Sequence, residues 1–195
     1  MVTTALSAML PTSIICGQPP QAIDVPTAVA RLHSYFATRA TSSYAWRKRQ
    51  LDALLALVTD NEQELRTALC TDLHTNLHTD LHRPLKGDGA GEIFNVQSEV
   101  RETLSQLAGW MAAERVQQMP HTEPFGVLLI VAPLNYPIWL LLHPLIAVIA
   151  AGNAAVLKPS ELTPTVSAAM ARLIPQYLDQ QAFAVVQGDI ESMAH

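Results

Sequence analysis

The chain has 195 residues, of which 49% are hydrophobic, and its 12 Lys plus Arg against 17 Asp plus Glu give a formal net charge of −5. A chain of this length forms one domain or slightly more and buries about 70% of the surface that the unfolded chain exposes. Composition and charge exclude an intrinsically disordered chain, which is poor in hydrophobic residues, and generic nucleic-acid binding, which needs a basic surface. A dense basic cluster, Arg47, Lys48 and Arg49, is interpreted as a solvated helix face.

The cysteines and the N-terminal residues indicate in which cellular compartment the protein is expected. Cys16 and Cys70 are too few for a disulfide framework and have no partners at metal-ligand spacing, which is typical of a reducing compartment. The first 22 residues include a mildly apolar stretch, but no basic residue precedes Arg31, so the charged region of a secretory or mitochondrial signal is missing. We expect residues 1–25 to form a loose N-terminal extension and the protein to be cytoplasmic.

Residues 26–122 are expected to form a helical segment without visible chemistry. Apolar residues recur at helical spacing in four stretches, at about 26–36, 43–58, 61–69 and 93–110. Asp60 or Asn61 could cap the third of these helices. Between the third and fourth stretches, the sequence KGDGAG at 86–91 predicts a turn rather than a phosphate-binding loop, because no strand precedes it.

Three nearly identical tetrads, TDLH, TNLH and TDLH, occupy residues 71–82. On a helix, their four-residue period would bring the imidazoles of His74, His78 and His82 onto one face, where they could hold a metal ion. We interpret the repeat as a tandem expansion of one tetrad instead, because the leucines share the same period. We therefore predict no metal site.

Residues 127–151 are apolar enough to suggest a membrane span. The stretch contains too many helix-breaking or polar residues for a membrane-spanning helix. They are Pro133, Asn135, Pro137, His143 and Pro144. A buried strand, a turn and a buried helix explain it better, so we expect no membrane span.

The second half of the chain predicts a β-α-β-α-β unit. The continuous apolar run at 127–131 is typical of a strand with both faces covered. A helix is expected at about 137–151, ending at Gly152, and a second strand at 154–157. Thr163 is expected to cap the next helix, with Pro164 at its first position, before a third strand at 183–186. The predicted fold class is α/β: an N-terminal helical segment followed by half of a doubly wound, Rossmann-like parallel sheet.

Polar residues follow the ends of the first two predicted strands. Asn135 follows the first strand, and Lys158 and Glu161 follow the second. In doubly wound sheets, ligands bind beyond the carboxyl ends of the strands, so we expect these three side chains at one edge, where a ligand would lie. No G-x-G-x-x-G sequence follows the first strand, and the residues alone therefore leave the ligand unnamed.

Five consecutive blocks carry a resemblance to a known family. They are EPFGV at 123–127, PLNYP at 133–137, AAGNA at 150–154, LKPSE at 157–161 and IPQYLD at 174–179. Together they resemble the aldehyde dehydrogenase superfamily, most closely its class 3-like branch, which acts on fatty and aromatic aldehydes. The helical half resembles the same branch, so the similarity covers about residues 26–188. The third tetrad is the one that fits the family, which makes the first two an insertion.

The resemblance implies a cofactor and a mechanism. Residues 123–195 would be part of an NAD(P)-binding domain, and in the reaction a cysteine thiolate attacks an aldehyde, a hydride passes to NAD(P)+, and a glutamate activates water to release a carboxylic acid. Asn135 matches the oxyanion-hole asparagine, whose amide donates without ionising. Lys158 and Glu161 match the residues that hold the adenosine ribose hydroxyls, although they could also form only a local ion pair. Pro133 and Leu134 match cofactor-binding positions, with Leu134 where the family usually has tryptophan.

The nucleophilic cysteine and the general-base glutamate of the similar proteins match no residue here, since neither Cys16 nor Cys70 lies in a matching block. We therefore interpret the chain as an N-terminal fragment of an NAD- or NADP-dependent aldehyde dehydrogenase, inactive on its own. The alternative is a non-catalytic nucleotide-binding or interaction module. The expected partner is a small-molecule aldehyde. A homo-oligomer or other association through an exposed sheet edge is also expected, because the first strand is central in the doubly wound order.

Overall fold

The computed structural model describes the backbone of residues 25–80, 90–116 and 123–188, and the side chains in these ranges except at 74–80, 90 and 113–116. The expected N-terminal extension, up to residue 24, lies outside the described residues, as do the side chains of His74, His78 and His82. The interpretation of the tetrad histidines therefore stays a prediction.

The first half of the chain is helical, as predicted. Ser43 precedes the second helix, and its hydroxyl accepts a hydrogen bond from the backbone N of Trp46 at 3.2 Å, which caps the helix N-terminus. The fourth helix begins at Ala90, so Ala90 and Gly91 are helical and do not belong to the expected turn. The elements are α1 (Val25–Ala37), a 3-10 turn (Ala40–Ser42), α2 (Tyr44–Asp60), α3 (Glu62–Asp80) and α4 (Ala90–Val116).

The second half forms the predicted β-α-β-α-β unit. The strands are parallel and lie in the order β1-β2-β3, so β2 has a strand on either side. This is the arrangement of one half of a doubly wound sheet, and the fold class is therefore confirmed. The elements are β1 (Val127–Val131), α5 (Trp139–Ala150), β2 (Ala154–Lys158), α6 (Pro164–Tyr177) and β3 (Phe183–Val185).

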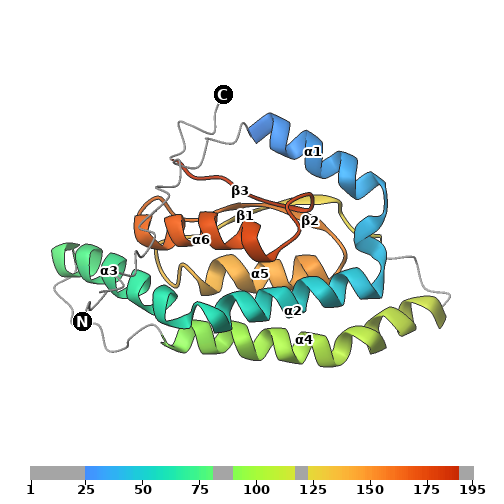
Figure 1. Ribbon diagram of the computed structural model, residues 1–195, viewed down its shortest axis with the longest axis horizontal. Coiled ribbons are helices and arrows are strands. Elements are labelled where there is room, and N and C mark those ends of the chain that lie inside the picture. The colour runs from blue at the N-terminus through green and yellow to red at the C-terminus, as the bar shows by residue number, and fades with distance from the viewer. Residues whose placement is uncertain (1–24, 81–89, 117–122, 189–195) are drawn as a thin grey trace, which may run out of the picture.

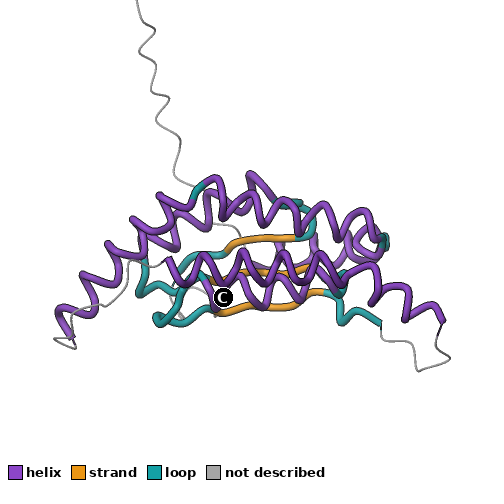
Figure 2. The backbone as a smooth tube through the Cα atoms, turned by 90° about the horizontal axis from the view of Figure 1, so that it is seen from below, coloured by secondary structure: helices purple, strands orange, loops and turns teal. Residues whose placement is uncertain are grey.

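The helices pack on both faces of the sheet. Helix α1 contacts β1 and β2, α5 contacts the same two strands, and α6 contacts β3. Figure 1 shows α1 on one side of the sheet and α5 and α6 on the other, with α2 and α4 forming a further layer beyond α5. Figure 2 shows the three strands running side by side. A continuous core of buried apolar side chains joins the two halves of the chain.

Strand β1 lies at an edge of the described sheet. Ala132 N donates to Lys158 O at 3.0 Å, so the backbone N–H and C=O groups at residue 132 face β2. These groups alternate sides along a strand, and the N–H and C=O groups of Leu129 and Val131 therefore face the open edge. Leu129 and Val131 each expose 57% of their surface. Leu129 and Val131 lie on the same face of β1, so the expectation that both faces of the strand are covered is wrong for that face. Separately, no strand among the described residues pairs with β1 on its second side.

The interpretation of the basic cluster as a solvated face is wrong for Arg47, which is 5% exposed. Its guanidinium donates from Nη1 to Ala150 O at 2.9 Å and from Nε to Thr41 O at 3.4 Å. Ala150 is the last residue of α5, so the cation satisfies a carbonyl at the negative end of the helix dipole. Gly152 has a φ of 77°, and a Cβ there would lie 2.7 Å from Arg47 Nη2. Only glycine permits this turn and this approach.

A second tie joins the helical half to the end of α6. The Asp179 carboxylate accepts hydrogen bonds from Tyr35 Oη at 2.7 Å and Trp46 Nε1 at 3.1 Å, while Asp179 N donates to Gln50 Oε1 at 2.9 Å. Burial alone would raise the pKa of Asp179, but the hydrogen bonds, the one from Tyr35 above all, bring it below its ordinary value. Asp179 is therefore an ionised anchor for α1 and α2.

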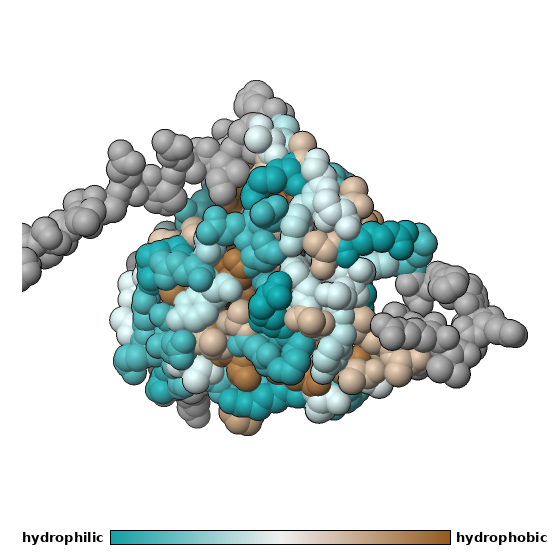
Figure 3. All heavy atoms as spheres, turned by 45° about the vertical axis from the view of Figure 1, so that its right-hand side comes forward, coloured by the Kyte–Doolittle hydropathy of each residue, from teal (hydrophilic) through white to brown (hydrophobic). Residues whose placement is uncertain are grey.

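The surface seen in Figure 3 is mainly hydrophilic, with hydrophobic side chains in small separate areas. In the part of the chain that the structure describes, none of the helices combines the length and the apolar character that a membrane crossing requires. This agrees with the interpretation of residues 127–151 as a strand, a turn and a helix.

We expect Arg47→Ala to lower the free energy of unfolding by about 2 kcal/mol, because the carbonyls of Ala150 and Thr41 lose a charged donor and a buried side chain is removed. The neighbouring Lys48, whose side chain is 48% exposed, provides the control. Lys48→Ala should change the same quantity by less than about 0.5 kcal/mol. Urea denaturation measures both, and equal losses would contradict the assignment of Arg47 as a buried cap.

Candidate functional site

The three strands end at one edge of the sheet. Val131, the last residue of β1, pairs with Lys158, the last residue of β2, and Leu157 pairs with Val185 at the end of β3. The ladder continues one step beyond the strands, because Val186 N donates to Leu157 O at 2.8 Å. The loops that follow the strands therefore leave the sheet side by side, at the edge where ligands bind in folds of this class.

Lys158 and Glu161 form an ion pair at this edge. The Lys158 side chain is 5% exposed and the Glu161 side chain 39% exposed, so a buried ammonium group meets a carboxylate that is open to solvent. The turn between them is held by Ser160, whose carbonyl accepts from Thr163 N at 3.2 Å and whose hydroxyl accepts from Leu162 N at 3.3 Å. A donor beside an acceptor suits a vicinal diol, because each hydroxyl can both donate and accept.

Asn135 lies in the loop between β1 and α5, at the same edge, and is exposed. Of the other two predicted cofactor-binding residues, Pro133 is exposed and Leu134 is half-buried. Tyr136, directly after Asn135, has a φ of 53°. A bulky residue adopts this left-handed conformation only where its surroundings hold it there. The sequence-predicted residues are thus brought to one edge, on two neighbouring loops.

Glu92, which the sequence analysis missed, holds the end of the loop that carries Asn135. It lies in the first turn of α4, is 7% exposed, and its Oε2 accepts from the backbone N of Ile138 and of Trp139, each at 3.0 Å. Burial raises the pKa of the Glu92 carboxyl, and the two N–H groups only partly offset this. The sequence carries no signal for this contact, since an acid in a first helical turn already favours its own helix dipole.

Asp72, which the sequence analysis also missed, binds the backbone N–H groups at the start of α6. Its two carboxylate oxygens accept from Thr165 N at 3.1 Å and from Val166 N at 2.8 Å. Thr163 stands at the N-cap position of α6 as predicted, but its hydroxyl donates to Ser160 O instead of capping the helix. Asp72 belongs to the first tetrad, and the interpretation of the first two tetrads as an insertion stays a prediction.

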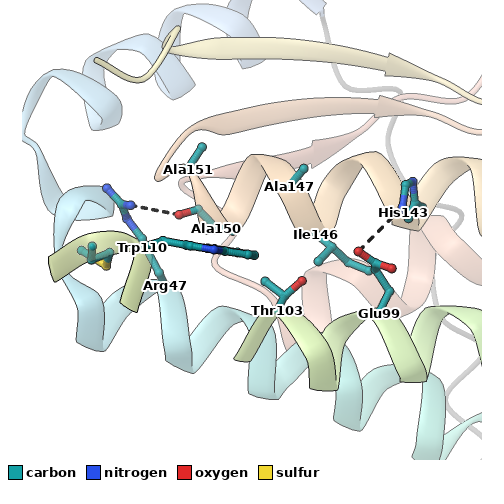
Figure 4. Close-up of a pocket in the computed structure, with 10 residues that line it drawn as sticks. Arg47, Glu99, Thr103, Trp110, His143, Ile146, Ala147, Ala150 and Ala151 are labelled. Atoms are coloured by element: carbon teal, nitrogen blue, oxygen red, sulfur yellow. Dashed lines mark hydrogen bonds and ion pairs between the residues drawn. The ribbon is translucent and has the colours of Figure 1, made fainter. Parts of the chain in front are cut away.

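A separate groove of about 510 Å³ lies between α4 and α5. Figure 4 shows Trp110 near Arg47 and Ala150 at one end, and the pair His143 and Glu99 at the other. His143 Nε2 and Glu99 Oε1 are 3.9 Å apart. The groove follows α5 from His143 to its C-terminal end, whereas Asn135 precedes the N-terminus of α5. None of the predicted site residues lines it, so it is not the ligand site discussed above.

No group of three or more His, Cys, Asp and Glu side chains that could hold a metal ion occurs in residues 25–73, 91–112 and 123–188. Cys70 is half-buried on α3. The predicted site residues Asn135, Lys158 and Glu161 supply a carboxamide, an ammonium group and a carboxylate at this edge.

Comparison with known proteins identifies a family. The family model described as "Aldehyde dehydrogenase family" matches residues 14–195. Aldehyde dehydrogenase family 3 member B3 of Mus musculus is 39% identical over 170 residues, covering 83% of this chain and 34% of its own. The "Aldehyde dehydrogenase, dimeric NADP-preferring" of Canis lupus familiaris is 34% identical over 175 residues, covering 85% of this chain and 37% of its own.

A solved structure supports the same assignment. AldH of Staphylococcus aureus in a substrate-bound state superposes with a TM-score of 0.74 and 31% identity, covering 88% of this chain and 38% of that one. The present chain spans about a third of the length of the curated relatives it matches.

The raised pKa of Glu92 predicts a pH dependence of stability. Because the pKa is higher in the folded chain than the ordinary value of 4.5, ionisation of Glu92 costs the folded state free energy. The free energy of unfolding of the native chain should therefore fall, relative to Glu92→Gln, as the pH rises from 4.5 through the raised pKa, and the difference should be constant above it. Urea midpoints between about pH 4 and 7 measure this difference. A difference that does not change with pH would contradict the prediction.

Proposed function

The chain belongs to the aldehyde dehydrogenase family, and on that premise we propose that it forms one part of a site where an aldehyde is oxidised to a carboxylic acid with NAD+ or NADP+ as acceptor. The observation that carries the proposal is that the loop with Asn135 and the Lys158–Glu161 ion pair follow two neighbouring parallel strands at the same carboxyl edge of the sheet. These are the residues that match the family's site, and their chemistry suits it.

Each of these side chains has a distinct role in the proposal. The Asn135 carboxamide donates to the oxygen of the aldehyde as it becomes an oxyanion, and loss of one such donor typically lowers the rate by about a hundredfold or more. Lys158 donates to, and Glu161 accepts from, the adenosine ribose hydroxyls of the cofactor. Pro133 and Leu134 line the cofactor cleft. The cofactor itself accepts the hydride.

The residues fit a nicotinamide dinucleotide through its ribose. The buried Lys158 ammonium is paired with the Glu161 carboxylate, which remains open to solvent. A diol can therefore bind to the carboxylate while the Lys158 charge keeps its partner. The relative from Canis lupus familiaris is named as NADP-preferring, which supports the same class of cofactor. The substrate proposed is a fatty or aromatic aldehyde, because the sequence blocks resemble the class 3-like branch of the family.

Residues 1–195 alone are proposed to lack turnover. Hydride leaves from a tetrahedral alkoxide that forms when a thiolate adds to the aldehyde, and neither Cys16 nor Cys70 lies in a block that matches the family's nucleophile. Without that addition, Asn135 has no oxyanion to stabilise. We also propose a division into a helical segment, 26–122, and a partial NAD(P)-binding domain, 123–195, and a cytoplasmic location.

The second candidate function is a non-catalytic nucleotide-binding or interaction module. The open edge of β1, with Leu129 and Val131 more than half exposed, favours association with another strand. The word dimeric in the name of the relative from Canis lupus familiaris supports a homo-oligomer in the family. Nucleotide binding without turnover would be common to both candidates, so the two experiments below address binding and association separately.

The first experiment titrates NAD+ and NADP+ into the 195-residue chain by calorimetry and assays NAD(P)H formation with a long-chain and an aromatic aldehyde. We expect binding without NAD(P)H formation, and we expect Glu161→Gln to weaken binding about tenfold, because a hydrogen bond between a ribose hydroxyl and a charged acceptor is lost. Asp52→Asn is the control. Asp52 also forms a lysine–carboxylate ion pair, with Lys48, but this pair is exposed and lies outside the proposed site. Turnover by this chain, or equal weakening by the control, would refute the proposal.

The second experiment tests the edge of β1 by light scattering. Leu129→Lys places a charge on the open edge and should shift the chain from associated species toward the monomer. Phe94→Lys is the control, because Phe94 is 64% exposed on α4 and its loss removes a similar apolar surface elsewhere. If Phe94→Lys reduces association as much as Leu129→Lys does, or if the native chain is already monomeric, the edge of β1 is not the contact.

A further inference from the structure

A buried carboxylate from the helical half fixes one end of the loop that carries Asn135. Glu92, on α4, accepts both the Ile138 and the Trp139 backbone N–H groups with a single oxygen, each at 3.0 Å. Helix α5 has no cap of its own: Ile138 stands at its N-cap position without a side-chain bond, and its first turn holds no acidic residue. The N–H groups of Ile138 and Trp139 are therefore satisfied by a side chain of another element.

The loop has a fixed backbone at both ends. Upstream, Ala132 N is bonded to Lys158 O at 3.0 Å, and downstream lie the two N–H groups that Glu92 holds. Residues 133–137 separate these anchors, with Asn135 at their centre, and both end residues of this stretch are prolines, which have no N–H to donate. The downstream anchor therefore depends on Glu92.

The backbone beside Asn135 is held in a conformation that it would not adopt freely. Tyr136 has a φ of 53°, and its carbonyl accepts from Leu140 N at 2.9 Å, which ties it to the first turn of α5. A tyrosine leaves this left-handed region when its surroundings no longer impose it. If the start of α5 were no longer held by Glu92, the backbone of Tyr136, directly after Asn135, would therefore move.

We propose that Glu92 is a positioning residue for Asn135: by holding the N–H groups of Ile138 and Trp139, it sets where the Asn135 carboxamide stands at the edge of the sheet. The catalytic meaning of that position rests on the proposed function, whereas the position itself does not. Oxyanion donors act over about 2.7–3.1 Å, so a displacement of about 1 Å is enough to lose the contact. Glu92 then influences the reaction without touching a reacting atom.

The test uses nuclear magnetic resonance on the 195-residue chain, with the side-chain amide signal of Asn135 and the exchange rates of the Ile138 and Trp139 amides as readouts. In Glu92→Ala, we expect those two amides to exchange about tenfold faster and the Asn135 signal to move. In Glu92→Gln, an oxygen remains in place to accept both bonds, so the Asn135 signal should stay at its native position. Glu92→Asp keeps the charge but withdraws it by one methylene, and it should behave as the alanine variant does.

The matched control is Asp72→Ala, which removes an equally buried carboxylate from the N-terminus of α6. It should accelerate exchange at Thr165 and Val166 and leave Asn135 unmoved. An unchanged Asn135 signal in both the Glu92→Ala and Glu92→Asp variants would overturn the proposal, and so would an equal movement in Asp72→Ala. If the alanine variant does not fold, the aspartate and glutamine variants decide the question between them.

This test is independent of the proposed function. If the chain binds neither NAD+ nor NADP+, the assignment of the site fails while the position of Asn135 can still depend on Glu92. If the nucleotides bind and both Glu92→Ala and Glu92→Asp leave Asn135 where it is, the site stands and the positioning role fails. The two failures are therefore distinguishable by separate measurements.

Discussion

Helix α5 receives a charged side chain from the helical half of the chain at each of its ends, and much of the structure follows from that constraint. Its sequence, WLLLHPLIAVIA, offers neither an acid at the start nor a base at the end, because it is packed between the sheet and the helical layer. Glu92 supplies the anion at its N-terminus and Arg47 the cation at its C-terminus. The helix dipole favours these signs at these ends. Two helices of the first half thus complete a helix of the second, and the halves fold as one packed body.

The same solution recurs at α6 and has a consequence for ligand binding. Asp72 caps the N-terminus of α6, and Asp179 just beyond its C-terminus is bound by side chains of α1 and α2. Helix N-termini commonly bind phosphate, but both N-termini at this edge already hold protein carboxylates. Among the described residues at this edge, the proposed site offers the side chains of Lys158 and Glu161, a donor beside an acceptor, which suit hydroxyl groups.

The sequence predicts those features of the fold that depend on short stretches of the chain. The strands, α5, α6 and the order of the sheet follow from apolar runs and from Gly152 and Pro164, and the edge that gathers Asn135 and Lys158 follows from the topology. Arg47 could not be recognised as buried, because its neighbour Lys48 has the same charge and lies in solvent. Tertiary caps such as Glu92 are also invisible, since Glu92 and Ile138 are far apart in the chain and only the packing of α4 on α5 brings them together.

Strand β1 illustrates the opposite case, in which the pattern and the structure disagree for a physical reason. Its five residues are all apolar, which is the pattern of a strand covered on both faces, yet Leu129 and Val131 are 57% exposed. Exposing such a run while its backbone groups face an open edge costs free energy that a neighbouring strand would recover. The site loop begins at the end of this strand. The same strand therefore leads directly to the loop that carries Asn135 and also has the open edge along which another strand would pair.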